Sequence, residues 1–278
     1  MSLSIRTNYA SLDAQRNLSN TQNALDSSIS RLSSGMRITK AGDDAAGLGI
    51  SVNLEAQVAS YNQAARNAND GISLAQTAEG SLNAVSNILS RMRELAMESA
   101  SDGVGVTQRA YIVTEATALS SELDRIQNTA EFNGNNFFLN AGPQTFQVGI
   151  RGDVDNDVIT VDTTGMDVSS GTLVAGVADA LGGLASDAQA TLGTIDDAID
   201  SVSGYRATLG AAGNRLQSAI STIQSASVNL SAANSRIRDV DIAEETSKLS
   251  RSQILAQAGI SVLAQANQMP QMALKLLG

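Results

Sequence analysis

Three aspartates at alternating positions, Asp153, Asp155 and Asp157, have the spacing with which a calcium-binding loop begins. Such a loop carries glycine at its sixth position and glutamate at its twelfth, where this chain has Val158 and Thr164. A solvated hairpin turn explains the three carboxylates better than a cation does. We therefore expect no metal site in this segment.

Other residue types that could do chemistry are missing or badly placed. The chain has no histidine and no cysteine, which excludes imidazole bases, thiolate nucleophiles, disulfides and zinc clusters built from these residues. Gly-x-Gly pairs occur at Gly47 and Gly103, but no strand precedes them and no phosphate-binding pattern follows. Asp196 and Asp197 are neighbours on a helix surface rather than a catalytic pair. The sequence therefore predicts neither an enzyme nor a cofactor.

Charge is concentrated in one stretch of the 278 residues. The net charge is −10, from 28 acidic and 18 basic residues, and all ten acids between Asp153 and Asp200 lie where there is no lysine or arginine. This acidic balance argues against nucleic acids and anionic membranes as partners. Aromatic residues make up only 3% of the chain, too few for base-stacking platforms or an aromatic-lined sugar groove.

Targeting signals are not evident. No apolar run approaches the ~18 residues of a membrane span, and the first residues lack the apolar core of a secretory signal. Taken alone this predicts a cytoplasmic protein. A chain exported by a dedicated secretion machine would have the same appearance.

Helical periodicity dominates the N-terminal half. Leucines at seven-residue intervals predict a first helix that ends near Ser33-Ser34-Gly35, and Asp43 and Asp44 are candidate caps of the next helix. A third helix is expected from about Thr107. The second helix is indicated by apolar residues in unbroken seven-residue steps: Leu54, Tyr61, Ala68, Ala75, Leu82, Leu89 and Ala96.

The middle of the chain has a different pattern. All four phenylalanines lie between Phe132 and Phe146, next to the turn signal Asn133-Gly134, and apolar residues then alternate up to Val161. This predicts one or two β-hairpins. Residues 165–183 are rich in glycine, serine and alanine and are expected to form a loop with a short helix.

Seven-residue periodicity resumes in the C-terminal part, over Ile195, Val202, Leu209, Leu216, Ile223, Leu230 and Ile237. A helix over 192–237 is about 69 Å long, whereas a compact globule of this size has a diameter of about 48 Å. We therefore expect a mainly α fold, an elongated antiparallel rod of long coiled-coil-like helices with a small β-hairpin subdomain. A last helical segment is expected to stop near Pro270.

The two ends carry apolar stripes that a single helix cannot bury. The stripe residues are Leu18, Leu25, Leu32, Ile242, Leu249, Ala256 and Leu263, surrounded by serine, asparagine and glutamine. Such helices are marginal alone and are stabilised when the stripe packs against a partner. We expect the ends to be poorly ordered in a free monomer and buried against other copies of the chain.

Both flanks of the variable middle closely resemble bacterial flagellin. The matching runs on the N-terminal side include 31–38, 43–47, 65–73, 91–96 and Phe132-Asn133-Gly134. On the C-terminal side they are 252–259 and 262–268. The resemblance covers about 1–140 and 190–278.

The resemblance implies a structural subunit of the extracellular flagellar filament. It implies terminal helices at 1–42 and 238–278 that form the inner filament core, a helical rod at 43–140 and 185–237, and a short variable region at 141–184. The implied partners are other flagellin copies, an export chaperone and the flagellar type III apparatus, with hook-associated and cap proteins at the filament ends. Export would occur without a cleaved signal.

Two alternatives stay open beside the filament subunit. One is a hook–filament junction protein, and the other is a helical secretion or adhesion module that acts through the acidic segment. The family resemblance also implies recognition by Toll-like receptor 5, at positions matching Arg91, Leu95 and Glu115. Glu98 departs from the glutamine that receptor-active members usually carry.

Overall fold

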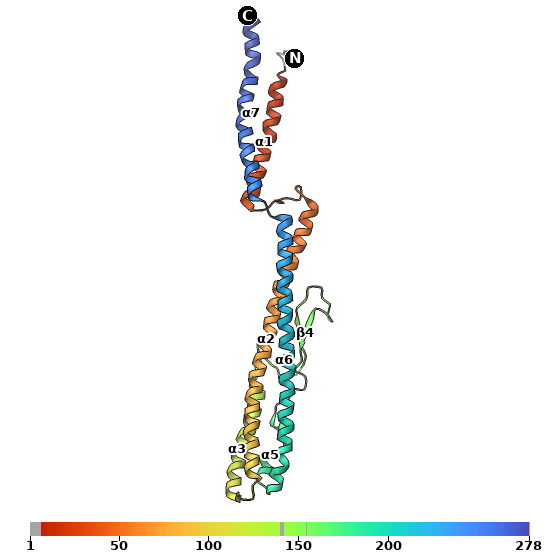
Figure 1. Ribbon diagram of the computed structural model, residues 1–278, viewed down its shortest axis with the longest axis vertical. Helices are drawn as coiled ribbons and strands as arrows, with labels where there is room; N and C mark the ends of the chain where they lie inside the picture. Colours follow the sequence, from red (N-terminus) through yellow and green to blue (C-terminus); the bar gives the residue numbers. More distant parts are fainter. Residues whose placement is uncertain (1–6, 140–141, 154, 278) are drawn as a thin grey trace. The chain divides into compact units, whose positions relative to one another are not determined.

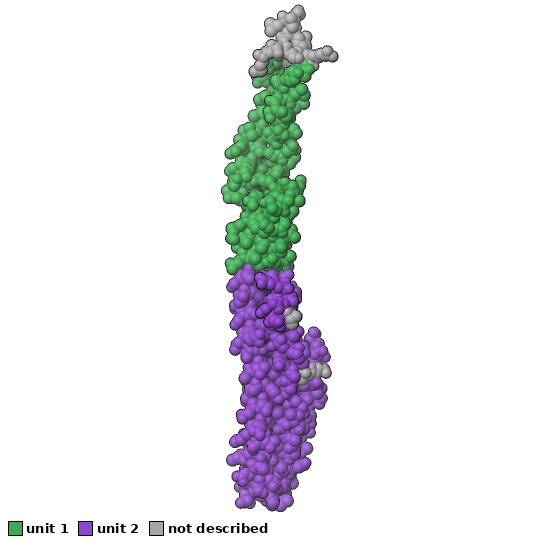
Figure 2. Space-filling model, turned by 90° about the vertical axis from the view of Figure 1, so that its right-hand side faces the viewer, with its two compact units in different colours: residues 1–58, 228–278 green, residues 59–227 purple. Residues whose placement is uncertain are grey.

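The computed structural model describes residues 7–139, 142–153 and 155–277, with side chains as far as Met269 (Figure 1). The chain forms two compact units (Figure 2). Unit 1 contains residues 1–58 and 228–278, and unit 2 contains residues 59–227. The helices and strands, in chain order, are α1 (Tyr9–Ser34), α2 (Ala45–Ser99), α3 (Val106–Thr129), β1 (Glu131–Phe132), β2 (Asn135–Asn136), β3 (Gln144–Gln147), β4 (Val158–Val161), α4 (Ser170–Leu173), α5 (Val177–Leu181), α6 (Ala185–Arg238) and α7 (Ile242–Leu277).

The mainly α fold predicted from the sequence is confirmed, and so are its helix boundaries on the N-terminal side. Helix α1 ends at Ser34, and Gly35 follows in the left-handed conformation with φ 71°. At the start of α2, Asp44 Oδ1 accepts a hydrogen bond of 2.9 Å from the Gly47 N–H, as an N-cap does. None of the described helices has a stretch that is both long and apolar enough to cross a lipid bilayer.

The core of unit 2 is formed where α2, α3 and α6 pack together. The seven-residue steps predicted for α2 and α6 supply several of its fully buried side chains, among them Leu82, Leu89, Leu209 and Leu216. Contacts between the two long helices show that they run antiparallel: Arg93 pairs with Asp196, Glu79 with Arg206, and Asn62 with Ser227.

One buried cation closes the end of unit 2 where α3 begins. Arg109, 9% exposed, donates from Nη1 to the Gly183 carbonyl at 2.6 Å and from Nη2 to the Ser101 carbonyl at 3.3 Å. These carbonyls lie just beyond the C-terminal ends of α5 and α2, where the helix dipole favours a positive charge. Arg109 therefore links the ends of α2 and α5 to α3, and no carboxylate of the described residues pairs with it.

The expected hairpins are both present in unit 2. Strands β1 and β2 pair antiparallel around Asn133-Gly134, whose positive φ angles of 52° and 78° suit a tight hairpin turn. Strands β3 and β4 also pair antiparallel, with Phe146 opposite Ile159. The side chain of Asn67 on α2 donates to the Gln147 carbonyl at 3.0 Å and so anchors β3 on the helix.

The aspartates between β3 and β4 are used by the turn itself. The Asp157 carboxylate accepts hydrogen bonds from the Arg151 and Asp153 N–H groups. Asp153 in turn accepts from the Asp155 N–H and from the Asn156 side chain, and these hydrogen bonds lower the pKa of its carboxyl. Among the described residues, no group of three or more acidic side chains is placed to hold a metal ion.

Two elements differ from the sequence-based expectation. Residues 165–183 contain two short helices, α4 and α5, rather than one, and the Asp124 carboxylate on α3 holds α4 by accepting from the Ser170 N–H and hydroxyl. Helix α7 does not stop near Pro270, because it continues to Leu277. The residues after the proline include alanine, leucine and lysine, which favour helix and offset the one hydrogen bond that proline removes.

The packing of unit 2 predicts a clear difference between two leucine truncations. We expect Leu89→Ala, at a fully buried site, to lower the free energy of unfolding by about 2–5 kcal/mol. Leu255→Ala, at a site 52% exposed on α7, should change it by less than about 0.5 kcal/mol. Urea unfolding followed by circular dichroism measures both. Equal effects would show that the core has been assigned to the wrong residues.

Candidate functional site

The N-terminal and C-terminal helices α1 and α7 pair with one another in unit 1 (Figure 1). Near their far ends, the Asn8 side chain donates to the Ala266 carbonyl at 2.8 Å, and the Ser11 hydroxyl donates to Asn267 Oδ1 at 2.8 Å. Further along, Leu18 packs over Gly259, where an added Cβ would lie 3.3 Å from the leucine Cδ1. These contacts define a seam between two antiparallel helices.

Most of the stripe residues predicted from the sequence lie on the seam side of their helices and are half-buried. They are Leu18, Leu25 and Leu32 on α1, and Leu249, Ala256 and Leu263 on α7. Ile242, at the first position of α7, is 65% exposed. The predicted stripe is therefore largely covered by the chain itself.

A second apolar stripe lies beside the seam on α7, about 100° round the helix from the first stripe. Leu255, Val262 and Met269 follow one another at seven-residue intervals and are 52%, 54% and 48% exposed. Next to them, Ile254 is 69% exposed and lines a shallow groove of about 550 Å³ with Arg251. We call Ile254, Leu255, Val262 and Met269 the outer stripe.

Unit 1 has almost no core of its own. In the described part of this unit, Ile38 and Ala266 are the only apolar residues that are fully buried, whereas the large buried cluster belongs wholly to unit 2. Most of the exposed large apolar side chains of the described chain also lie in unit 1. Because each Å² of apolar surface removed from water contributes about 25 cal/mol, unit 1 has a strong tendency to associate.

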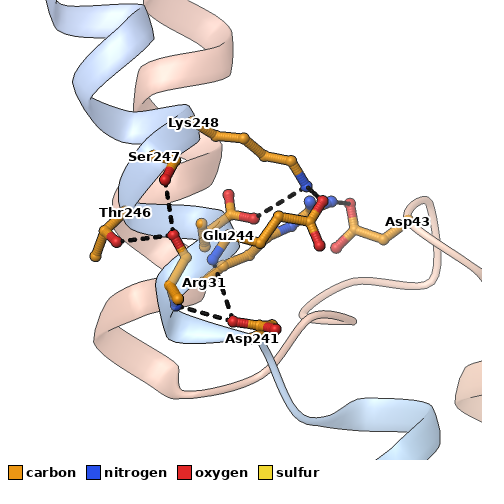
Figure 3. A network of polar contacts seen from close by, with 9 residues as sticks. Arg31, Asp43, Asp241, Glu244, Thr246, Ser247 and Lys248 are labelled. Carbon is orange, nitrogen blue, oxygen red and sulfur yellow. Dashed lines mark hydrogen bonds and ion pairs between the residues drawn. The ribbon is translucent and has the colours of Figure 1, made fainter.

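Polar contacts organise the base of the α1–α7 pair (Figure 3). Asp241 caps α7 by accepting from the Ala243 and Glu244 N–H groups, and Lys248 Nζ pairs with Glu244 Oε1 at 2.8 Å. The hydrogen bond to Glu244 raises the pKa of Lys248. Glu245, 3% exposed, also lies within 3.6 Å of Lys248 Nζ.

The two linkers that lead into this pair are joined by main-chain hydrogen bonds. The Val240 N–H donates to the Gly35 carbonyl at 3.0 Å, and the Arg37 N–H donates to the Arg238 carbonyl at 2.6 Å. Asp43 closes the first linker, because its carboxylate accepts from the Thr39 and Lys40 N–H groups, which lowers its pKa. The base of the pair is thus held by hydrogen bonds, with Ile38 as its buried apolar residue.

Two family models match the chain and decide its identity. The model of the bacterial flagellin N-terminal helical region matches residues 5–142, and that of the C-terminal helical region matches residues 192–277. The chain belongs to the bacterial flagellin family.

Individual relatives agree with this assignment over nearly the whole length. A flagellin of Halalkalibacterium halodurans is 41% identical, over 98% of this chain and 99% of its own. The flagellar filament 33 kDa core protein of Treponema phagedenis is 37% identical over the same shares. Among solved structures, a flagellar hook-associated protein of Vibrio parahaemolyticus superposes with a TM-score of 0.62 over 71% of this chain and all of its own. Its 16% identity makes that likeness one of fold alone.

The receptor candidates of this flagellin do not share one surface. Arg91 and Glu115 are both exposed and pair across α2 and α3, with Arg91 Nε 2.7 Å from Glu115 Oε1. This pair, with a second hydrogen bond to Glu94, raises the pKa of Arg91. Leu95, the third matching position, does not lie on this surface, because its side chain is 1% exposed within the core of unit 2.

The outer stripe of this flagellin was missed by the sequence analysis, although its signal is the same. Leu255, Val262 and Met269 repeat every seven residues, as Leu249, Ala256 and Leu263 do. Two such stripes about 100° apart make the apolar surface of α7 wider than the part that α1 covers, so this helix needs a further partner beside α1. Only the structure shows which stripe α1 covers.

The two stripes predict different outcomes for neighbouring substitutions in this flagellin. We expect Val262→Asp to abolish polymerisation and to leave the monomer folded, because residue 262 is exposed in the monomer and a buried unpaired carboxylate costs several kcal/mol. Leu263→Asp should abolish polymerisation as well, and should also weaken the α1–α7 seam in the monomer. Sedimentation measures polymer, and circular dichroism of the monomer measures helix.

The matched control is Gln257→Asp, which adds the same charge on a different exposed face of α7. It should polymerise at least partly. If the Val262→Asp chain polymerised normally, the outer stripe would not be part of the assembly surface.

Proposed function

We propose that this flagellin, a structural subunit of the bacterial flagellar filament, polymerises by burying the outer stripe and the exposed side of α1 against neighbouring copies. The single observation that supports this mechanism is the missing core of unit 1. Its apolar residues are distributed so that the chain covers one face of each terminal helix and leaves the other face in water. Identical copies arranged with helical symmetry can cover all of these faces at once.

The division into two units suits such a polymer. Unit 2 buries its own cluster and can fold without neighbours, so a subunit can be stable before it assembles. Unit 1 supplies the surface whose burial drives addition to the growing end. Folding of one unit and assembly through the other are thereby separated within one chain.

The same exposed surface requires protection before assembly. We infer that an export chaperone covers the terminal helices in the cell and that the subunit leaves through the flagellar type III apparatus to an extracellular filament. Hook-associated and cap proteins would then meet the stripe at the two filament ends. The exposed outer stripe supports this order, since uncovered apolar surface of this kind leads to aggregation.

A hook–filament junction protein is the less favoured reading. The likeness to a hook-associated protein is one of fold, at 16% identity, whereas the flagellin of Halalkalibacterium halodurans and the filament core protein of Treponema phagedenis match nearly end to end.

Electron microscopy of the purified chain distinguishes the two functions. After monomers are seeded with short filament fragments, we expect long filaments of uniform diameter, because every added subunit exposes a new outer stripe. The control is the Val262→Asp chain under the same seeding. Short rings or caps that do not elongate would contradict the filament function.

A second proposal concerns recognition of the monomer by Toll-like receptor 5. It is supported by Arg91 and Glu115, whose exposed guanidinium and carboxylate lie together on the α2–α3 surface of unit 2. Arginine offers a planar set of donors, which makes it a frequent anchor of binding interfaces. Because Leu95 is buried in the core, the proposed contact with the receptor depends on the polar groups of this surface.

The receptor proposal predicts that monomers activate a Toll-like receptor 5 reporter. Arg91→Ala should reduce the response about tenfold or more, because it removes charge-assisted hydrogen bonds worth about 1.5–3 kcal/mol. Arg125→Ala, which removes another exposed arginine of unit 2, is the matched control and should retain the response. No response from the unmodified monomer, or equal responses from both variants, would end the proposal.

A further inference from the structure

Unit 2 contains a cavity of about 850 Å³ that plays no part in the terminal-helix surface. Residues of α2, the β1–β2 hairpin and strand β3 line it, and it is open to solvent on one side. Its volume lies within the range of about 300–1,000 Å³ that is typical of small-molecule sites.

The apolar walls of this cavity contain three of the four phenylalanines of the chain, Phe132, Phe137 and Phe146. Phe137 is almost fully buried, whereas Phe132 and Phe146 are half-buried and keep part of their rings open. Phe146 lies flush on α2 because residue 71 is glycine, where an added Cβ would be 3.1 Å from the ring. The low aromatic content of the sequence argued against an aromatic-lined sugar groove. Composition alone, however, does not show that three of the few aromatic rings lie together in one cavity.

Four polar side chains of the lining have no hydrogen-bond or ion-pair partner in the part of the chain that the structure describes. They are Asp70, Asn133, Asn135 and Gln144, of which the first three are exposed and Gln144 is half-buried. Asn136 is different, because its amide donates to the Gln127 carbonyl and accepts from the Phe138 and Leu139 N–H groups. Asn136 therefore stabilises the wall of the cavity, and the other four polar side chains remain available to a ligand.

The amide, carboxylate and aromatic side chains of the cavity together favour one class of ligand. Three amides offer both donors and acceptors, and the Asp70 carboxylate accepts from hydroxyl groups. Aromatic faces pack against the C–H groups of a saturated ring, while the absence of a cationic side chain from the lining disfavours phosphates and carboxylates. We propose that the cavity binds a neutral saccharide, with Asp70 and Gln144 hydrogen-bonding its hydroxyls and Phe132 and Phe146 stacking on its ring.

The site would give the flagellin monomer a carbohydrate-binding function that does not depend on polymerisation through unit 1. Saturation-transfer NMR on full-chain monomers tests it, with irradiation of the aromatic protons. The probes are the methyl glycosides of glucose, galactose, mannose and N-acetylglucosamine. We expect transfer to the ring protons of at least one sugar, and its dissociation constant follows from a titration.

Three single variants locate the binding. Asp70→Asn and Gln144→Leu should each weaken binding about fivefold, the loss expected for one hydrogen bond. Thr145→Val is the control, since residue 145 is exposed on the opposite face of β3 from Gln144 and Phe146. Its affinity should be unchanged.

Three results would overturn the proposal. The first is the absence of transfer to any of the four sugars, and the second is equal affinity in all three variants. The third is that Asp70→Asn and Gln144→Leu impair polymerisation without any sugar binding, which would make the cavity a contact between copies. Polymerisation of the unmodified chain is measured in parallel, so a failure of sugar binding and a failure of filament assembly are distinguished.

Discussion

The terminal unit of this flagellin cannot bury its own apolar residues, and the other features of the molecule follow from this constraint. Helices α1 and α7 cover one another along a half-buried seam in which small and polar residues such as Ser11 and Gly259 replace a core. The outer stripe is left in water, although it is as regular as the seam. A chain with this distribution leaves apolar surface uncovered, which supports our proposal that other copies cover it in the filament.

Unit 2, in contrast, buries its apolar residues in a core of its own. Leu82, Leu89, Leu209 and Leu216 are fully buried, and Arg109 closes one end by binding the carbonyls that follow two helices. The ten acidic residues between Asp153 and Asp200 lie in the β3–β4 turn, in loops and on the surfaces of α5 and α6 rather than in the core. The buried core and most of the exposed apolar side chains therefore lie in different parts of the sequence, so that a change in one need not alter the other.

Much of this fold could be predicted from the sequence, because helices are recognised by the spacing of their apolar residues and by their capping residues. The seven-residue steps, the glycine after α1, Asp44 and the Asn133-Gly134 turn all indicate local structure through local chemistry, and each was confirmed. What could not be predicted depends on contacts between distant residues. The burial of Leu95, the face of α7 that α1 covers, and the convergence of three phenylalanines on one cavity are set by packing that no local spacing reveals. The helix past Pro270 was missed for a different reason, since the rule for proline neglects the strong helix formers that follow it.

Hydrogen exchange measured by mass spectrometry on the same chain as monomer and as filament tests the central claim most directly. In the monomer, the amides of α1 and α7 should exchange far faster than those of the central parts of α2 and α6, because unit 1 lacks a core to resist opening. In the filament, α1 and α7 should become protected by orders of magnitude while unit 2 changes little. Terminal helices that are already as protected in the monomer as the core of unit 2, and that gain nothing on assembly, would contradict the account.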